Sequence, residues 1–475
     1  MTFDLLVSGG SVTKTGGRPA SKGVIPGDYA LSVGKPASTP PPGWRWTLLS
    51  DVARLETGHT PSRKHPEYWG GPIPWIGIRD ATGNHGTKIF ETQQYTNALG
   101  IENSSARVLP PNTVCLSRTA SVGYVVVMGR HMATSQDFVN WVCSPQLDYR
   151  FLKYVLLSER EALLRYASGT THQTIYFPEA KAFHVCMPAI AEQHRIVDVL
   201  QPLDDRIALL HDTNATLEAI AQALFKSWFI DFDPVRAKSQ GLAPAGMDEA
   251  TAALFPEGFE ESAQGLLPKG WRFAPVGDVV DGIYDGPHAT PPESEEGPVF
   301  LGIKNLTGTG LDFGEVRHIA ESDFGQWTRR VLPAAGDIVF SYEATLGFFA
   351  LVPPGLRCCL GRRLALIRPR PNAADGHFFF HQFIAAPFQR LLERHTIQGA
   401  TVNRIALKHF PSYPVMDPPP AVKAAFDATV APIWARIHAN QAQAQSLTQI
   451  RDALLPRLIS GQLRLPEAAA EAATA

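Results

Sequence analysis

The chain has 475 residues, enough for two or three domains, and 44% of them are hydrophobic, as is usual for globular proteins. A net charge of −2 excludes the uniformly basic composition of a general polyanion binder. The five cysteines include no C-x-x-C pair, so we expect no zinc site, and no apolar run is long enough to predict a membrane span or a signal peptide. These features favour a reduced, cytoplasmic protein.

Residues 1–42 are rich in Gly, Ser and Pro and predict an extension or linker. Within them, residues 23–33 (GVIPGDYALSV) contain enough apolar side chains to dock on a folded domain. Acidic residues concentrate later in the chain, because residues 191–267 carry eight more acidic than basic side chains. The flanking stretches are near neutral or mildly basic, which is compatible with nucleic-acid contact through local patches.

Four sequence matches recur in the same order, at offsets of 224 to 230 residues. GWRWTLLSDVARLETG from Gly43 matches GWRFAPVGDVVDGIYDG from Gly270, and PWIGIRDATG from Pro74 matches PVFLGIKNLTG from Pro298. Further on, SRTASVG at 117–123 matches SYEATLG at 341–347, and SGTTHQT at 168–174 matches QGATVNR at 398–404. A period this long predicts a duplicated domain, not a solenoid.

Each repeat ends in apolar residues spaced alternately by three and four, which is typical of a coiled-coil helix. Matching prolines, Pro202 and Pro432, predict helix starts, so each helix would run about 28 residues, with Gly461 ending the second. The two seams pack either on each other or on their own domains. Their polar members, Asn214 and Asn440, either fix the register or lie exposed. The seam positions are Ile196, Leu200, Leu203, Ile207, Leu210, Asn214, Leu217, Ala221, Leu224 and Trp228, and Phe426, Val430, Ile433, Ile437, Asn440, Ala444, Leu447, Arg451, Leu454 and Leu458.

An aromatic cluster follows the first seam, formed by Leu224, Phe225, Trp228, Phe229 and Phe232. It is either buried under a recognition domain or exposed to receive a partner. Residues 234–267 then predict a second linker.

Three segments resemble the specificity subunit of Type I restriction-modification systems. GHTPSRKHPEYWGGPIPWIGIRD (58–80) is similar to the start of a recognition domain of that family, although the second repeat lacks its TPS and WGG spacing. MPAIAEQHRIVDVLQPLDDRI (187–207) with ALFKSWFIDFDPVRAK (223–238) resembles the central conserved region, and LTQIRDALLPRLISGQL (447–463) resembles the distal one.

The resemblance implies an α+β fold: two β-rich target recognition domains in tandem, separated and held by two long antiparallel coiled-coil helices. It also implies double-stranded DNA as ligand, two methyltransferase subunits that use S-adenosylmethionine, and motor-endonuclease subunits that use ATP and magnesium. The expected limits are an extension (1–42), recognition domain 1 (43–190), central helical region (191–233), linker (234–267), recognition domain 2 (268–415), distal helical region (416–463) and tail (464–475).

The chain itself shows no catalytic motif and no cofactor or metal site. The motif Asp417-Pro-Pro-Pro420 resembles that of adenine methyltransferases, but its last proline cannot stack on a flipped base. No P-loop sequence is present, and His131, His184 and His194 lie singly, so we interpret them as structural. We therefore expect a non-catalytic DNA reader. The alternative is a scaffold whose duplicated domains bind protein and do not read DNA.

Base reading requires side chains with hydrogen-bonding groups on loops, and phosphate contact requires cations and hydroxyls. Trp69 and Trp75 are interpreted as core residues. The segments 169–172 and 399–401 either touch phosphate or form turns. The candidate DNA-contacting residues in the first repeat are Thr60, Ser62, Arg63, Lys64, Arg79, Asp80, Arg118, Thr119 and Ser121, and in the second Lys304, Asn305, Tyr342, Glu343, Thr345, Arg362 and Arg363.

Overall fold

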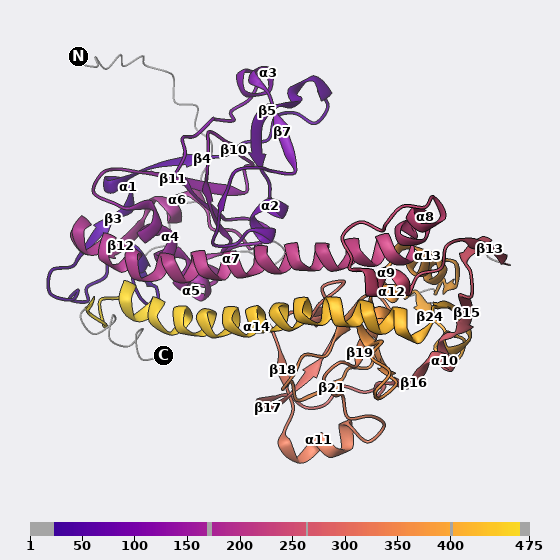
Figure 1. The fold of residues 1–475 in the computed structure, drawn as a ribbon. Helices are drawn as coiled ribbons and strands as arrows, with labels where there is room; N and C mark the ends of the chain where they lie inside the picture. The colour runs from indigo at the N-terminus through magenta and orange to yellow at the C-terminus, as the bar shows by residue number, and fades with distance from the viewer. Residues whose placement is uncertain (1–22, 169–172, 263–264, 400–401, 466–475) are drawn as a thin grey trace. The chain divides into compact units, whose positions relative to one another are not determined.

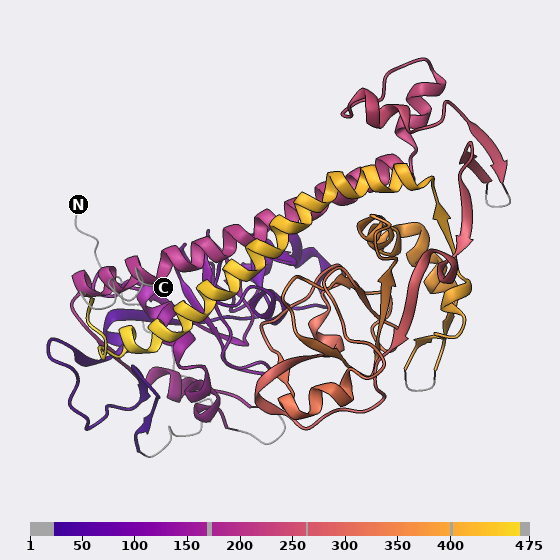
Figure 2. The same cartoon turned by 60° about the horizontal axis from the view of Figure 1, so that its bottom comes forward.

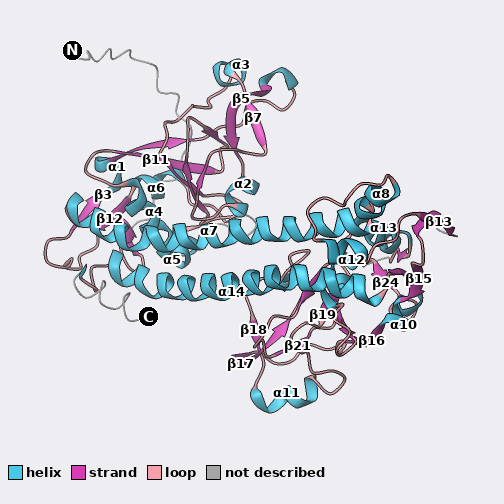
Figure 3. Ribbon diagram, viewed as in Figure 1, coloured by secondary structure: helices cyan, strands magenta, loops and turns pink. Residues whose placement is uncertain are grey.

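The computed structural model describes all residues except 1–22, 169–172, 263–264, 400–401 and 466–475. The chain forms two compact units (Figure 1). Unit 1 takes the residues up to Arg206 and those from Leu447 onward, and unit 2 takes Ile207–Ser446. Both boundaries fall inside long helices, so each unit combines segments that are distant in sequence. Figure 3 shows the mixture of helices and strands that the sequence predicted.

The main sheet of unit 1 has the strand order β4-β11-β8-β9-β6. Its central strands are runs of β-branched and aromatic residues that are buried almost throughout, which suits a sheet covered on both faces. The helix α4 (Tyr149–Ser158) packs on one face through Phe151, Leu152 and Val155. The strands are β4 (Ala53–Thr57), β6 (Lys88–Ile89), β8 (Val114–Ser117), β9 (Val125–Met128) and β11 (Phe138–Cys143).

A smaller sheet with the order β10-β5-β7 adjoins the main one in unit 1. The strand β5 (Trp69–Ile76) pairs with β7 (Gln94–Thr96) in antiparallel and with β10 (Ala133–Thr134) in parallel fashion. Residues 58–96 together with β10 are called the β5 lobe below. Short helices flank the sheet: η1 (Pro66–Tyr68), α2 (Ile78–Gly83) and α3 (Ala98–Glu102).

The segment 23–33 docks on unit 1, as its apolar composition suggested. Its strands join a third sheet of order β1-β2-β12-β3. The carboxylate of Glu159 accepts the N–H groups of residues 28–31 at 2.5–2.9 Å, which fixes the turn between the two strands. The elements are β1 (Ile25–Pro26), β2 (Leu31–Val33), β3 (Arg45–Leu48) and β12 (Phe183–Met187), with α1 (Leu49–Val52), α5 (Arg160–Tyr166) and α6 (Phe177–Lys181) nearby in the chain.

Unit 2 repeats these sheets, which confirms the duplication. The order β16-β22-β19-β20 corresponds to β4-β11-β8-β9, the order β18-β17-β21 corresponds to β7-β5-β10, and β15-β25 corresponds to β3-β12. The strands are β15 (Arg272–Pro275), β16 (Val280–Asp285), β17 (Ser294–Leu301), β18 (Arg317–His318), β19 (Ile338–Ser341), β20 (Phe349–Leu351), β21 (Cys358–Leu360), β22 (Leu364–Pro369) and β25 (Pro414–Asp417).

The remaining elements of unit 2 connect these sheets or cover them. The stretch predicted as a second linker holds two short helices and the hairpin β13-β14. The elements are α8 (Asp233–Ser239), α9 (Glu249–Ala253), β13 (Phe259–Ser262), β14 (Gly265–Pro268), α10 (Val276–Val279), η2 (Ile303–Asn305), α11 (Glu321–Trp327), α12 (Gly376–Ile384), α13 (Ala386–Arg394), β23 (Thr396–Ile397), β24 (Arg404–Ile405) and η3 (Phe410–Ser412).

The two long helices are α7 (Ile190–Phe229) and α14 (Pro420–Ile459), each of 40 residues (Figure 2). The prediction that they start at Pro202 and Pro432 was wrong, because each begins 12 residues earlier. A proline inside a helix removes one backbone hydrogen bond and costs about 3 kcal/mol. Burial of the apolar residues that precede each proline, such as Val197 and Phe426, offsets this cost.

The helices run antiparallel, and their seams pack both on each other and on the cores. In unit 1 the start of α7 and the end of α14 share a core, with Leu200 and Leu458 both buried. In unit 2 the amide of Asn440 donates to Oδ1 of Asn214 at 2.8 Å, so these seam residues are buried partners. Gly461, with φ of +71°, follows the end of α14 as predicted.

The aromatic cluster after the first seam is part of the unit 2 core. Phe225, Trp228 and Phe229 are buried and contact Phe378 and Phe426 edge to face or tilted, with ring centroids 4.8–5.8 Å apart. The structure therefore supports burial of this cluster within the chain, and not its exposure to a partner.

Among the described helices, none has a stretch long and apolar enough to cross a membrane.

Candidate nucleic-acid interface

The third sequence match forms a tight hairpin between β8 and β9 in unit 1. Ser117 organises it: its Oγ accepts the N–H of Tyr124 at 2.8 Å and donates to the carbonyl of Ser121 at 2.5 Å. Its own carbonyl accepts the N–H of Gly123 at 3.0 Å. Ala120 at the tip has φ of +65°, a left-handed conformation that is unfavourable for a residue with a Cβ.

The same hairpin occurs between β19 and β20 in unit 2. The Oγ of Ser341 accepts the N–H of Phe348 at 3.2 Å, and its carbonyl accepts the N–H of Gly347 at 3.1 Å. Ala344 also has φ of +65°. A strained backbone at matching alanines of two divergent repeats indicates a conformation held in place by its surroundings, as is common at functional sites.

Each hairpin rests on the segment that leads to its long helix, so the third and fourth sequence matches meet in space. In unit 1 the N–H of Ile175 donates to the carbonyl of Arg118 at 2.9 Å. In unit 2 the N–H of Ile405 donates to the carbonyl of Tyr342 at 2.8 Å. Residues 169–172 and 400–401 lie outside the described residues, so the alternatives of phosphate contact and turn remain open there.

The hairpin candidates of unit 1 lie together and are partly exposed: Arg118, Thr119 and Ser121. The Nε of Arg118 is buried and has no hydrogen-bond partner among the described residues. This burial lowers the pKa of Arg118, and the nearby Asp137 opposes the effect. The guanidinium group is therefore charged and only partly solvated.

The other unit 1 candidates belong to the β5 lobe. Thr60 donates to Gln136, and Ser62, Lys64 and Arg79 are exposed. The guanidinium carbon of Arg63 lies 4.0 Å from the ring centroid of Trp69.

The interpretation of Trp75 as a core residue is confirmed, because its side chain is buried. Trp69 is half-buried and meets Trp75 edge-on at 5.2 Å.

Three candidates are buried and serve the fold. Asp80 accepts the N–H groups of Gly77 and Gln93, both at 2.9 Å, and so closes the turn before α2. Asn305 closes the equivalent turn in unit 2. The hydroxyl of Tyr342 donates to Asp285 at 2.8 Å. Asp80, Asn305 and Tyr342 are therefore excluded from the candidate interface, because their polar groups already form hydrogen bonds inside the protein.

The exposed unit 2 candidates fall into two groups. Glu343 lies beside Arg363 at 3.9 Å in the hairpin region, where Thr345 and Arg362 are exposed. Lys304 lies apart in η2 and pairs with Glu315 at 3.4 Å.

Sequence reasoning did not include Gln94 and Gln136, which contact Arg63 and Thr60. The fold brings these residues together from distant parts of the chain, and no spacing along the sequence signals their contact.

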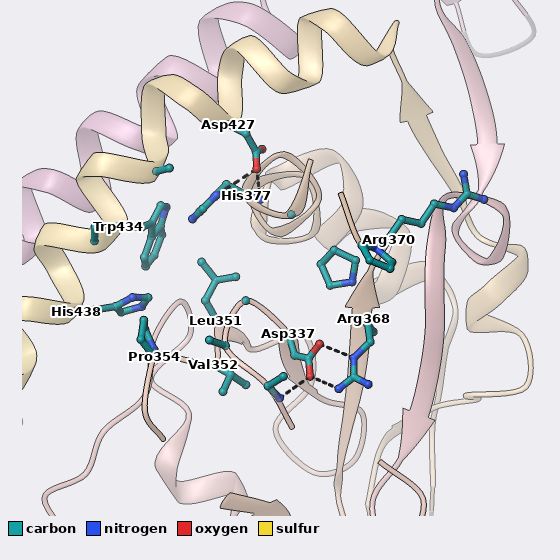
Figure 4. A pocket seen from close by; sticks show the side chains of 18 residues that line it. Asp337, Leu351, Val352, Pro354, Arg368, Arg370, His377, Asp427, Trp434 and His438 are labelled. Atoms are coloured by element: carbon teal, nitrogen blue, oxygen red, sulfur yellow. Dashed lines mark hydrogen bonds and ion pairs between the residues drawn. The ribbon is translucent and has the colours of Figure 1, made fainter. Parts of the chain in front are cut away.

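A cavity of about 560 Å³ lies in unit 2 between α14 and the sheet, away from the hairpin (Figure 4). His377 and Asp427 pair on one side at 3.2 Å, and Arg368 and Asp337 pair on another at 2.6 Å. None of the hairpin residues lines this cavity.

Comparison with known proteins finds a matching family model and similar proteins. Residues 41–219 match the family model described as the Type I restriction modification DNA specificity domain. The specificity subunit of the Type I restriction enzyme MjaIX from Methanocaldococcus jannaschii is 26% identical over 436 residues, covering 90% of this chain and 95% of that protein. The specificity subunit of HindI from Haemophilus influenzae is 25% identical over 389 residues, covering 70% and 84%.

A solved structure shares the fold. The crystal structure of the S subunit of a Type I restriction-modification system from M. genitalium matches with a TM-score of 0.52 at 16% identity, covering 87% of this chain and 96% of that one. The duplicated sheets and the paired long helices agree with these matches, and the chain is similar to Type I restriction-modification specificity subunits over most of its length.

Proposed function

We propose that this chain reads a bipartite, asymmetric sequence on double-stranded DNA, with one half-site for each unit. The observation that carries the proposal is the hairpin, in which the serine accepts two equivalent hydrogen bonds and an alanine has the same positive φ in both units. The side chains around its tip differ: Arg118 and Thr119 in unit 1 correspond to Tyr342 and Glu343 in unit 2. A constant backbone with different side chains is what two readers of different sequences require.

The proposed contacts are the candidates that remain exposed or half-buried. Cations near DNA position the protein on phosphates, and side chains with fixed donors and acceptors read base edges. The set comprises Thr60, Ser62, Arg63, Lys64, Arg79, Arg118, Thr119 and Ser121 in unit 1, and Lys304, Glu343, Thr345, Arg362 and Arg363 in unit 2.

The long helices would set the unread gap between the half-sites. A helix rises about 1.5 Å per residue, so 40 residues correspond to about 60 Å. Adding the same number of residues to α7 and α14 is expected to lengthen the gap and to leave the half-site sequences unchanged.

We further propose that α7 carries a methyltransferase subunit, and that endonuclease subunits join the complex through it. Leu209 and Ile220 are 54% and 45% exposed and lie 11 residues apart, so they share one face of the helix. Replacing both with glutamate should abolish co-purification with the methyltransferase subunit. Retention of the partner by that variant would contradict this docking face.

The decisive experiment is to sequence the methylated positions in cells that express the chain with its methyltransferase partner. We expect a bipartite motif with a fixed gap. Arg118→Ala should weaken or relax one half-site, and Thr345→Ala in the hairpin of unit 2 should affect only the other. An assembled complex without any motif would favour the scaffold alternative, and equal loss at both half-sites would contradict local reading.

A further inference from the structure

One cation of the β5 lobe has a fixed orientation and no carboxylate partner among the described residues. The guanidinium of Arg63 lies on the face of Trp69 at 4.0 Å and within 5.2 Å of the ring centroid of Trp75. Its Nη2 donates to Oε1 of Gln94 at 2.7 Å. Within the described part of the chain no carboxylate pairs with Arg63, so an aromatic face and a neutral amide hold it in place.

The platform under Arg63 is itself anchored to the loop. The indole Nε1 of Trp75 donates to the carbonyl of His59 at 3.1 Å, and that of Trp69 points to the carbonyl of Ser62 at 3.4 Å. Trp69 and Trp75 meet edge to face, at an interplanar angle of 87°. The loop, the platform and the cation are thus connected, while the guanidinium remains exposed at the surface.

The equivalent lobe of unit 2 is built differently. In the register of β17, Ser294 takes the place of Trp69, and Arg317 of β18 takes the place of Gln94. Arg317 pairs with Glu293 at 2.9 Å. The residue that corresponds to Arg63 at the same sequence offset is His288, whose Nε2 lies 2.7 Å from Oδ2 of Asp285. Charge in this lobe of unit 2 is paired with carboxylates, whereas the charge of Arg63 is not.

An arginine that is oriented but not neutralised suits a ligand with two adjacent acceptors. The O6 and N7 atoms of guanine present such a pair in the major groove, and arginine donates to them through two N–H groups. Phosphate contact requires charge more than orientation, and the exposed Lys64 beside it can supply charge. A feature present in only one repeat also fits base reading, because both repeats need phosphate contacts but each reads its own bases.

We propose that Arg63 reads a guanine in the half-site of unit 1, with Trp69 and Gln94 as positioning residues. This inference rests on the proposed function and names the base contact that makes unit 1 specific.

The test compares the methylated motif of the wild-type complex with that of Arg63→Ala and Arg63→Lys. The lysine variant keeps the charge and loses the two-pronged donor. We expect both variants to lose preference for guanine by about tenfold or more at one position of one half-site. Arg54→Ala is the matched control, because it removes a unit 1 cation that is already paired with Glu56. It should leave the motif unchanged.

Other outcomes overturn the inference. An unchanged motif in Arg63→Ala would exclude base reading. Uniformly weaker binding to the wild-type motif in Arg63→Ala, rescued by lysine and with a shallower salt dependence, would make Arg63 a phosphate contact. A wild-type complex that assembles and methylates no motif would overturn the proposed function, and this inference with it, whereas a motif that is intact in the wild type isolates the role of Arg63.

Discussion

The two repeats share a backbone but stabilise their long helices with opposite chemistry. Where α7 begins, the buried amide of Gln193 accepts the N–H of Asp148 and donates to the carbonyls of Gln146 and Pro188. At the same place in α14, Lys423 lies 3.2 Å from Asp375 and 2.9 Å from Asp417. Unit 1 uses neutral hydrogen bonds here, and unit 2 uses buried ion pairs.

The polarity reverses farther along the helices. Asp204 of α7 accepts hydrogen bonds from Lys153 at 3.1 Å and Tyr154 at 2.8 Å, and Arg451 lies 3.1 Å from it. At the matching place in α14, Trp434 donates to the buried His381 at 3.0 Å. Exchanging the two helices would put a tryptophan against a buried lysine and a carboxylate against an aromatic core. The difference teaches that interior polarity assigns the first part of each long helix to its own unit.

Removing Asp204 is expected to have the largest effect. Asp204→Ala leaves the buried Lys153 without its counter-ion, which should cost unit 1 about 3–5 kcal/mol of unfolding free energy. Burial already lowers the pKa of Lys153, so the lysine would lose its proton more easily in the variant. Denaturant unfolding followed by hydrogen exchange in β8 and β11 measures the change.

The double variant Lys153→Met with Asp204→Leu provides the control. Unit 2 fills the equivalent space with Phe380, His381 and Trp434, so an uncharged interior is compatible with this backbone. We expect the double variant to recover most of the lost stability. If it unfolds as readily as Asp204→Ala, lost volume and not unpaired charge explains the cost.

Breaking the ionic contact at the start of α14 should have the next largest effect. Lys423→Met leaves Asp375 buried without a cation, while Arg272 still pairs with Asp417 at 2.8 Å. Because burial raises the pKa of Asp375, protonation limits the expected loss to about 3 kcal/mol. Gln193→Met in unit 1 should cost about 1–2 kcal/mol, since it removes only neutral hydrogen bonds. Equal losses in unfolding titrations of the two variants would contradict the contrast between the units.

The buried histidine makes unit 2 sensitive to acid. Burial, helped by the charge of His377, lowers the pKa of His381 to about 3, against 6.5 for an unperturbed histidine. The unfolded state therefore binds a proton in a pH range where folded His381 does not. As a result, the free energy of unfolding falls as pH drops from about 6.5 toward 3. His381→Gln keeps an acceptor for Trp434 and should reduce the loss between pH 7 and pH 5 by up to about 2 kcal/mol. Parallel pH dependences in unfolding experiments on wild type and variant would show that His381 does not titrate in this way.

The sequence predicted the duplication, the long helices and the exposed hairpin residues, because these depend on local patterns. Ser117 and Ser341, which match in sequence, also occupy equivalent places in the two hairpins. Each is followed three residues later by an alanine with positive φ. The starts of the long helices were mispredicted, because the rule that places proline in a first turn ignores the burial that stabilises an interior proline.

The candidate site was less predictable than the fold. Asp80 and Tyr342 are residue types that often contact DNA. Their hydrogen-bond partners Gln93 and Asp285 come from other strands or turns, so the sequence alone did not show that both side chains are used inside the protein. The platform of Arg63 depends on the pairing of β5 with β7, which no local pattern reveals. Side-chain roles of this kind follow from register, whereas the domain limits proposed from the sequence stay predictions.

The smallest expected effect concerns the two asparagines at the polar seam positions. The buried Asn214 and Asn440 form a hydrogen bond, and Asn214 also donates to the carbonyl of Ile437 at 3.3 Å. Asn440→Leu leaves Oδ1 of Asn214 unsatisfied and should cost about 1 kcal/mol in denaturant unfolding. Replacing both asparagines with leucine should restore stability, but a polar seam pair can fix the register of two helices at a cost in stability. The double variant should then relax the fixed gap of the methylated motif, and a motif with an unchanged gap would show that the rest of the seam sets the register.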